Sequence, residues 1–166
     1  MSQVLRADGT LIADDIRVIR DATAQAAAGD VIPLKTFISL TPAQRAGVGV
    51  WLAPDSEPEL IAPHVAELAV IAVDFPAFKD GRGFSAATLL RTRYGFRGDL
   101  RAIGDVIADT VFYLRRVGFT SFVLRADQDP QDAVRALRTF TDVYQASVDQ
   151  TVPYFRRRAA AQGARP

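Results

Sequence analysis

The sequence predicts one α/β domain whose sheet is mainly parallel and open, with about four or five strands built from βαβ units. Part of a barrel is the alternative geometry. The main observation is that apolar, strand-like runs alternate with stretches of helical periodicity from Gly49 onward. A second observation is that four such units are too few to close an eight-stranded barrel. A third is the length of 166 residues, which suits one domain that folds without disulfides.

A β-hairpin is expected at the N-terminus, over residues 3–19. Asp8-Gly9 stands between two apolar runs, and glycine accepts the positive φ angle that a tight hairpin turn requires. Residues 22–30 are small and polar, which is typical of a loop, and the apolar run at 31–34 suits a short strand. Thr41 followed by Pro42 is typical of a helix N-cap and first helical residue, so a short helix is expected there.

The clearest strand in the chain is Leu68–Asp74. Its nearly continuous apolar run suits a parallel strand that is covered on both faces. The segments at 49–53, 100–103 and 119–124 are shorter apolar runs of the same kind. Together these four segments form the predicted parallel part of the sheet.

Three helices are expected between and after these strands. The first covers Phe84–Tyr94 and ends at Gly95, a common helix terminator. The second starts near Asp105, which is expected to cap it, and ends at 118. The third starts at Asp129-Pro130 and runs to about residue 146. Residues 1–150 then make the domain, and the basic tail at 151–166 is expected to fray or to pack on a partner chain.

The composition excludes several classes of protein. A formal charge of +1 gives no electrostatic case for binding nucleic acid, and the arginines and aromatics at 91–97 and 113–116 suit helix ends and the core instead. No apolar run approaches the ~20 residues of a membrane span. The N-terminus lacks the apolar core of a signal peptide, so a cytoplasmic location is expected.

The chain contains no cysteine and a single histidine, His64. Disulfides, thiolate zinc sites, cysteine-ligated iron–sulfur clusters and thiol redox chemistry are therefore excluded, and no metal site is expected. No P-loop is present, and the glycines at 81 and 83 lack the acidic partner of a dinucleotide site. No cofactor is evident. A flavin or nicotinamide bound without a standard motif remains open, as does homo-oligomerisation.

Ligands of parallel α/β proteins gather at the carboxyl ends of the strands, so the segment after Asp74 is the first candidate site. It contains Lys79, Asp80, Arg82 and Ser85. Its two glycines allow close approach of a ligand, and an arginine can bind an oxyanion with two parallel hydrogen bonds. The helix that starts near Ser85 adds free N–H groups. An equally weighted interpretation is a tight connection in which Asp80 caps a turn and Arg82 pairs with Asp74.

Two further arginines complete the set of anion-binding candidates. Arg101 lies within a predicted strand, where it could face Asp74 or Asp105, and Arg125 ends the last strand. The anion-binding candidates are Lys79, Arg82, Ser85, Arg101 and Arg125. The candidates for a catalytic general base are Asp74, Asp80 and Asp105.

Five unusual blocks follow one another at close spacing. They are DFPAFKDGRGFS at 74–85, LLRTRYG at 89–95, GDLRAIGDV at 98–106, FYLRRVGF at 112–119 and FVLR at 122–125. Together they resemble a bacterial family of unknown function, DUF934. The resemblance extends from about Val50 to Tyr144, and the hairpin and the tail contribute little to it.

The resemblance implies a place in assimilatory sulfite reduction more directly than it implies a reaction. Members of the family are described as oxidoreductases of sulfite reduction, because their genes lie beside those for sulfite reductase and phosphoadenylylsulfate reductase. Sulfite reductase itself needs siroheme and a cysteine-ligated cluster. A chain without cysteine cannot ligate such a cluster, so this chain is not expected to be the catalytic subunit.

Three hypotheses follow for the function. The preferred one is an accessory protein that docks on sulfite reductase or on another enzyme of sulfate assimilation. Binding of a small oxyanion by the candidates named above is compatible with it. The alternative is an oxidoreductase or other enzyme that acts on a sulfur-pathway metabolite with an aspartate as general base.

Overall fold

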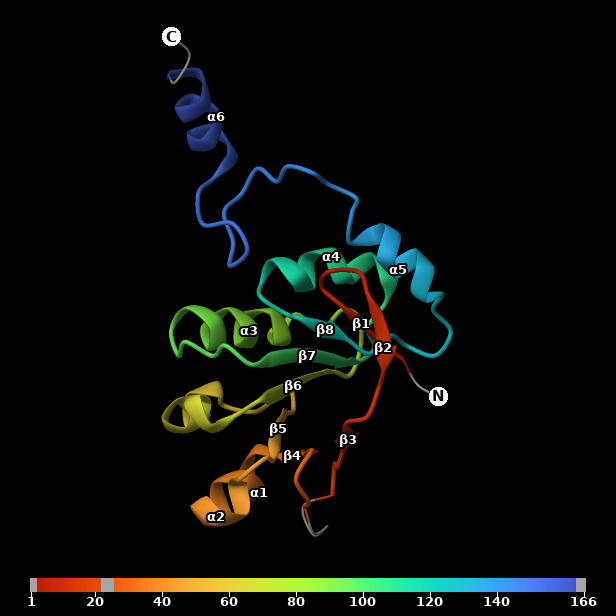
Figure 1. The fold of residues 1–166 in the computed structure, drawn as a ribbon, viewed down its shortest axis with the longest axis vertical. Helices are drawn as coiled ribbons and strands as arrows, with labels where there is room; N and C mark the ends of the chain where they lie inside the picture. Colours follow the sequence, from red (N-terminus) through yellow and green to blue (C-terminus); the bar gives the residue numbers. More distant parts are fainter. Residues whose placement is uncertain (1–2, 22–25, 164–166) are drawn as a thin grey trace.

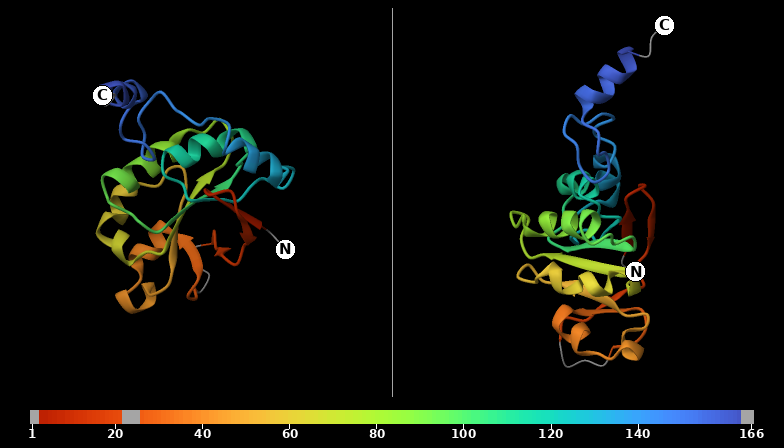
Figure 2. Two further views of the ribbon diagram at one scale, coloured as in Figure 1. Left: turned by 45° about the horizontal axis from the view of Figure 1, so that its top comes forward. Right: turned by 90° about the vertical axis from the view of Figure 1, so that its left-hand side faces the viewer.

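The computed structural model describes residues 3–21 and 26–163, and in it eight strands form one strongly curled sheet (Figures 1 and 2). The strands are β1 (Gln3–Arg6), β2 (Leu11–Ala13), β3 (Arg17–Val18), β4 (Asp30–Pro33), β5 (Gly49–Leu52), β6 (Val70–Phe75), β7 (Asp99–Gly104) and β8 (Ser121–Phe122). The helices are α1 (Leu34–Ser39), α2 (Pro42–Arg45), the 3₁₀ helix η1 (Pro58–Glu67), α3 (Arg82–Thr92), α4 (Ala108–Arg116), α5 (Pro130–Ala136) and α6 (Tyr154–Gly163).

The sheet is mixed and has eight strands, so the prediction of a mainly parallel sheet of four or five strands is wrong. The order is β2-β1-β8-β7-β6-β5-β4-β3. The strands from β3 to β8 are parallel to their neighbours, whereas β1 pairs antiparallel with both β2 and β8. The predicted hairpin is confirmed as β1 and β2, and it extends the sheet at β8.

The two edge strands of this sheet follow each other in the chain. Only Asp14, Asp15 and Ile16 separate β2 from β3, and such a link spans at most about 14 Å. The two edge strands, β2 and β3, must therefore lie close together, and an eight-stranded sheet can bring its edges together only by curling. The result is a half-barrel, consistent with the alternative of part of a barrel. The hairpin that was expected to reach residue 19 ends at Ala13, because β3 joins the opposite edge.

Alternating side chains of the strands build two cores. One set faces the helices on the convex side and includes Val50, Val73 and Leu100 in the larger apolar cluster. The other set faces the concave side, where Ala72 and Ile103 belong to a smaller cluster. This two-sided burial explains why the parallel strands are apolar at nearly every position.

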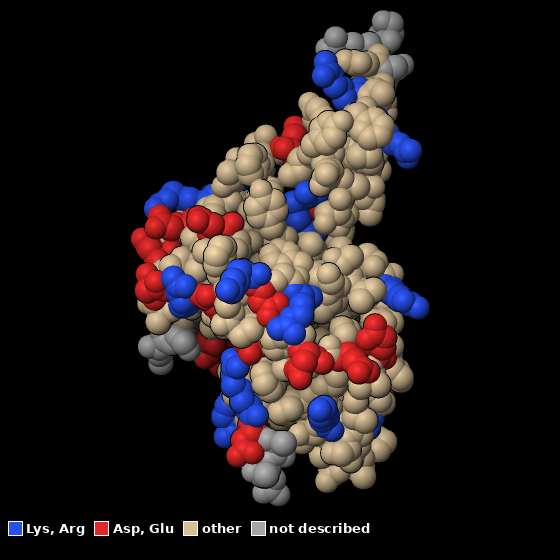
Figure 3. Space-filling view, turned by 180° about the vertical axis from the view of Figure 1, so that it is seen from behind, with Lys and Arg blue, Asp and Glu red and all other residues tan. Residues whose placement is uncertain are grey.

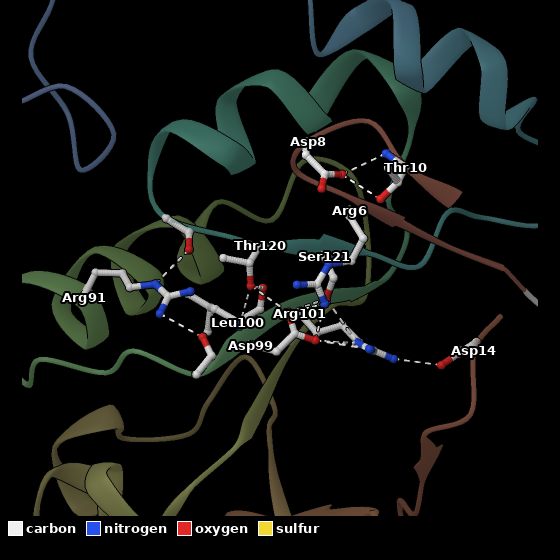
Figure 4. Close-up of polar contacts among 12 residues, drawn as sticks. Arg6, Asp8, Thr10, Asp14, Arg91, Asp99, Leu100, Arg101, Thr120 and Ser121 are labelled. Carbon is white, nitrogen blue, oxygen red and sulfur yellow. Dashed lines mark hydrogen bonds and ion pairs between the residues drawn. The ribbon is translucent and has the colours of Figure 1, made fainter. Parts of the chain in front are cut away.

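A buried ion-pair network occupies the concave face near the amino end of β7 (Figure 4). The guanidinium of Arg101 is only 4% exposed, and it bonds Asp14 at 2.8 Å and Asp99 at 3.1 Å. Its Nε also donates to the Ser121 hydroxyl. Arg101 faces neither Asp74 nor Asp105, because Asp74 lies near the carboxyl end of β6 and Asp105 follows the end of β7. Arg101 instead fastens the link between β2 and β3 to the sheet.

Several helix boundaries differ from those predicted. Helix α4 begins at Ala108, and Gln128 accepts a hydrogen bond from its first N–H, so Asp105 does not cap this helix. Helix α5 ends at Ala136 instead of near residue 146. The helix predicted after Thr41 is confirmed as α2, with the amide of Thr41 donating to the side chain of Gln44.

Residues 139–163 form a C-terminal arm, in which α6 stands away from the body (Figures 1 and 2). The arm is tied to α4 through Arg116, which bonds the carbonyl of Gln145 and pairs with Asp149 at 3.5 Å. Arg157 of α6 pairs with Asp142 at 3.0 Å, which folds the arm back on itself. Across the described part of the chain, no helix is both long enough and apolar enough to cross a bilayer.

Candidate functional site

The carboxyl ends of the parallel strands meet at one edge of the half-barrel, where they surround an open cleft. The cleft has a volume of about 560 Å³ and lies over β6, β7 and β8. Two arginine–aspartate pairs line it, together with the apolar end of β6. Its lining residues are Arg20, Asp74, Phe75, Pro76, Gly104, Asp105 and Arg125.

One wall of the cleft is the pair formed by Arg20 and Asp74. Both guanidinium NH groups of Arg20 donate to the carboxylate, at 2.8 and 3.2 Å. Asp74 is 7% exposed whereas Arg20 is 54% exposed, so the arginine covers the aspartate and still faces solvent. The same guanidinium lies 5.1 Å from the ring centroid of Trp51, a cation–π contact that further orients it.

The opposite wall is Arg125, which is held by two carboxylates. It bonds Asp105 at 2.5 Å and Asp127 at 2.6 Å. Hydrogen bonds from Arg125 and from the amide of Phe78 lower the pKa of Asp105. Arg125 likewise lowers the pKa of Asp127 to about 2. Asp105 therefore joins the loop after β6 to the end of β8, instead of capping a helix.

Gly104 keeps the floor of the cleft open. Its φ angle of +94° lies in the left-handed region, which glycine adopts without strain. A Cβ atom here would approach the Asp74 carboxylate to 2.7 Å and would collide with the Phe75 carbonyl. The close approach of β7 to β6 at this point therefore depends on a residue without a side chain.

The predicted segment after Asp74 reaches this cleft only with Phe75 and Pro76, and its candidate residues at 79–85 do not line it. Arg82 pairs with Asp80 at 2.6 Å and not with Asp74, and Asp80 also accepts from the Arg82 amide, as the turn interpretation expects. The Arg82 guanidinium lowers the pKa of Asp80 to about 2. Arg82 and Ser85 line a separate pocket of about 230 Å³. Lys79 is exposed, and no ion pair of the described residues engages it.

These contacts determine which chemistry is possible at the carboxyl ends of the strands. Asp80 and Asp105 have lowered pKa values, so both are ionised at neutral pH and are weak general bases. Arg20 and Arg125 are partly exposed and face one cleft, and each guanidinium keeps N–H groups that its carboxylate partners do not use, which an oxyanion could accept from. Of the predicted anion-binding residues, the structure brings only Arg125 to this cleft. In the described ranges, no cluster of three or more His, Cys, Asp or Glu could hold a metal ion.

Sequence reasoning missed Arg20 and Trp51. Arg20 meets Asp74 across 54 positions of sequence, and no local pattern signals that contact. Trp51 lies inside the predicted strand at 49–53, so the rule that selects residues at strand ends does not select it. Its indole nitrogen is buried and has no hydrogen-bond partner within the part of the chain that is described.

One comparison with known proteins assigns a family to this chain. The profile of a bacterial protein family of unknown function, DUF934, matches residues 49–155. The matched range contains strands β5 to β8, the cleft residues Asp74, Asp105 and Arg125, and most of the arm. No curated protein matches the chain.

Proposed function

The chain belongs to the DUF934 family of bacterial proteins, and from that premise we propose that it is an accessory protein of assimilatory sulfite reduction that docks on sulfite reductase. The pathway rests on the description that members of the family carry. The docking role rests on one feature of the molecule, the aromatic and basic surface of the C-terminal arm.

The arm and the adjoining helix α4 expose several large aromatic side chains. Tyr113, Phe140, Tyr144 and Phe155 are between 51% and 69% exposed. The first three line a shallow groove of about 420 Å³ between α4 and the arm, and the rings of Phe112 and Phe140 lie 5.1 Å apart at its base. Exposed aromatic patches of this kind mark protein–protein contacts, since burying such rings supplies much of the binding energy.

Arginines accompany these aromatics at the tip of the arm, where Figure 3 shows basic atoms at its outer end. Arg156 and Arg158 of α6 are exposed, and Arg156 lies 5.9 Å from the ring of Phe155. Arginine and aromatic residues are the types that most often dominate protein interfaces. The arm therefore has the composition of a docking segment, and sulfite reductase is its proposed partner.

Docking is tested with purified sulfite reductase and the full chain. We expect a complex whose absorption spectrum shows siroheme while this chain alone is colourless. The double variant Tyr144→Ala with Phe155→Ala should weaken binding at least tenfold, about 1.4 kcal/mol, because two exposed aromatic contacts are lost. Leu60→Ala is the matched control, since Leu60 is also an exposed apolar residue but lies far from the arm along the chain.

The alternative function has an equally clear signature in the same experiment. A chain that stays alone and elutes yellow with flavin would contradict the accessory role and favour an enzyme. Equal binding by the double variant and by the Leu60→Ala control would reject the arm as the docking surface.

As a second part of the proposal, a small oxyanion binds between Arg20 and Arg125. Both guanidinium groups line the cleft, and both are about half exposed. Titration calorimetry with sulfite should give a saturable signal that Arg125→Gln removes, while the circular dichroism spectrum of the variant shows that it is still folded. Arg82→Gln is the control, because Arg82 lines a different pocket. Loss of binding in Arg82→Gln alone would move the site to the segment after Asp74.

A further inference from the structure

A second pocket opens at the same edge of the half-barrel, over the carboxyl ends of β4 and β5, and the proposed function leaves it unused. Its volume of about 330 Å³ is in the range of small-molecule sites. Its walls come from residues 33–36, from Trp51 and from residues 53–60, and Arg20 separates it from the cleft over β6 to β8.

The lining of this pocket is mostly apolar. Leu34, Trp51 and Leu60 contribute to it from three different segments. Leu60 is 48% exposed, so a ligand in the pocket would cover apolar surface that now faces water. An inorganic ion gains nothing from such walls, whereas a ligand with an apolar chain is removed from water by them.

The pocket also presents charges of both signs, of which Asp55 lies near enough to Arg82 to interact with it electrostatically. Lys35 comes from the segment after β4, and Asp55 and Glu57 come from the segment after β5. Within residues 3–21 and 26–163, no ion pair or side-chain hydrogen bond engages these three side chains. The neighbouring arginines at this end of the sheet differ from them, because Arg20, Arg82 and Arg125 each form an ion pair with an aspartate.

We propose that this pocket binds a small zwitterion with an apolar chain, the class to which free α-amino acids belong. The ligand carboxylate lies at Lys35, with Arg20 beside it, and the ligand ammonium lies at Asp55 and Glu57. The apolar chain packs on Leu34, Trp51 and Leu60. Because the charged groups come from two different segments, a ligand that carries both charges links the ends of β4 and β5. This site is independent of the docking role.

Trp51 provides a direct probe of binding, since it is the single tryptophan of the chain and it lines the pocket. The full chain is titrated with norleucine, and tryptophan fluorescence and melting temperature are both recorded. Hexanoate lacks the ammonium of norleucine, and pentylamine lacks its carboxylate. We expect saturable binding of norleucine with a dissociation constant of about 1 mM or tighter, and at least about tenfold weaker binding of the other two.

Variants separate the two charge contacts. Lys35→Ala and Asp55→Asn, both at exposed positions, should each weaken norleucine binding about tenfold, because each removes one charge-assisted contact. Binding of hexanoate should respond to Lys35→Ala and not to Asp55→Asn. Lys79→Ala is the control, since Lys79 is exposed and outside this pocket.

Three outcomes overturn the proposal. The first is equal affinity for norleucine and hexanoate, which makes the pocket a simple anion site. The second is the absence of a saturable fluorescence change together with an unchanged melting temperature. The third is an equal loss of binding in the Lys79→Ala control. None of these outcomes bears on binding to sulfite reductase, so the two proposals fail separately.

Discussion

The arginines of this protein have different roles, which depend on how far each side chain is buried. Arg101 is almost fully buried and joins Asp14 to Asp99, so its task is structural. Arg91 is also structural, because it donates to the carbonyls of Gly118, Phe96 and Gly98, and burial lowers its pKa. Arg20 and Arg125 are about half exposed at the cleft, where a guanidinium remains available to a ligand.

The variant Arg101→Met should be strongly destabilising. It leaves the carboxylate of Asp14 without its arginine, and it leaves Asp99 only the longer pair with Arg6 at 3.8 Å; both carboxylates are 13% exposed. We expect a loss of about 3–5 kcal/mol in the free energy of unfolding, measured by urea denaturation. Arg135→Met is the control, because Arg135 and its partner Asp132 are both largely exposed, and it should change stability by less than about 1 kcal/mol. Similar losses for the two variants would mean that the Arg101 network does not hold the sheet together.

Strand and helix ends determine the shape of the candidate sites. Strand β7 ends at Gly104, whose positive φ angle and lack of a side chain let it lie against β6. Helix α3 starts after Gly81, which has a φ angle of −86° and open space around it. Position 104 therefore requires glycine, whereas position 81 has room for a residue with a side chain.

Gly104→Ala should lower the free energy of unfolding by about 2–3 kcal/mol. The left-handed conformation is strained for alanine, and the added methyl group collides with the end of β6. Gly81→Ala should be neutral or should stabilise by about 0.4–1 kcal/mol, since alanine tolerates that backbone and reduces the entropy of the unfolded chain. Thermal melting of both variants checks this, and a milder effect of Gly104→Ala than of Gly81→Ala would reject the argument.

The whole molecule is a curled sheet whose two edges are fastened by ion pairs. Arg101 holds the β2–β3 link at Asp14, and Arg17 of β3 pairs with Asp30 of β4 at 2.6 Å. Arg20 then reaches Asp74 on β6. These pairs draw residues 14–20 across the concave side, so the closure of the half-barrel depends on charge as well as on burial.

Acid should therefore loosen the edge at β3. Hydrogen bonds from Arg17 and from the amide of Ala27 lower the pKa of Asp30 from its usual 3.8 to about 2. A carboxyl group with a lowered folded-state pKa stabilises the fold above pH 3.8, and this contribution is lost as the pH falls through about 2.

The variant Asp30→Asn tests this contribution. Urea midpoints measured between pH 4 and pH 2 should fall less steeply than in the unmodified protein. Part of the pH dependence should remain in the variant, because the pKa values of Asp80 and Asp127 are also lowered to about 2. An identical slope in the variant would show that Asp30 is not linked to the acid transition.

Local sequence patterns were sufficient for the kinds of element and for several of their ends. The Asp8-Gly9 turn, the apolar strand now seen as β6 and the start of α5 after Asp129 all depend on interactions within a few residues. The alternating order of strand and helix along the chain then implied an α/β fold and placed a candidate site at the carboxyl ends of the strands. Of the candidates that this rule selected, Asp74, Asp105 and Arg125 lie at one cleft.

The tertiary structure alone decided the number of strands, their order and the partners of the charged residues. Strand β3 has two residues and is stable only against β4, so its own sequence carries little signal. Arg20 meets Asp74 across 54 positions, and Arg101 meets Asp14 across 87. The physical reason is that local periodicity reports which face of an element is buried and where the chain turns. The partner of a buried charge depends on how distant elements are stacked, which only the folded sheet determines.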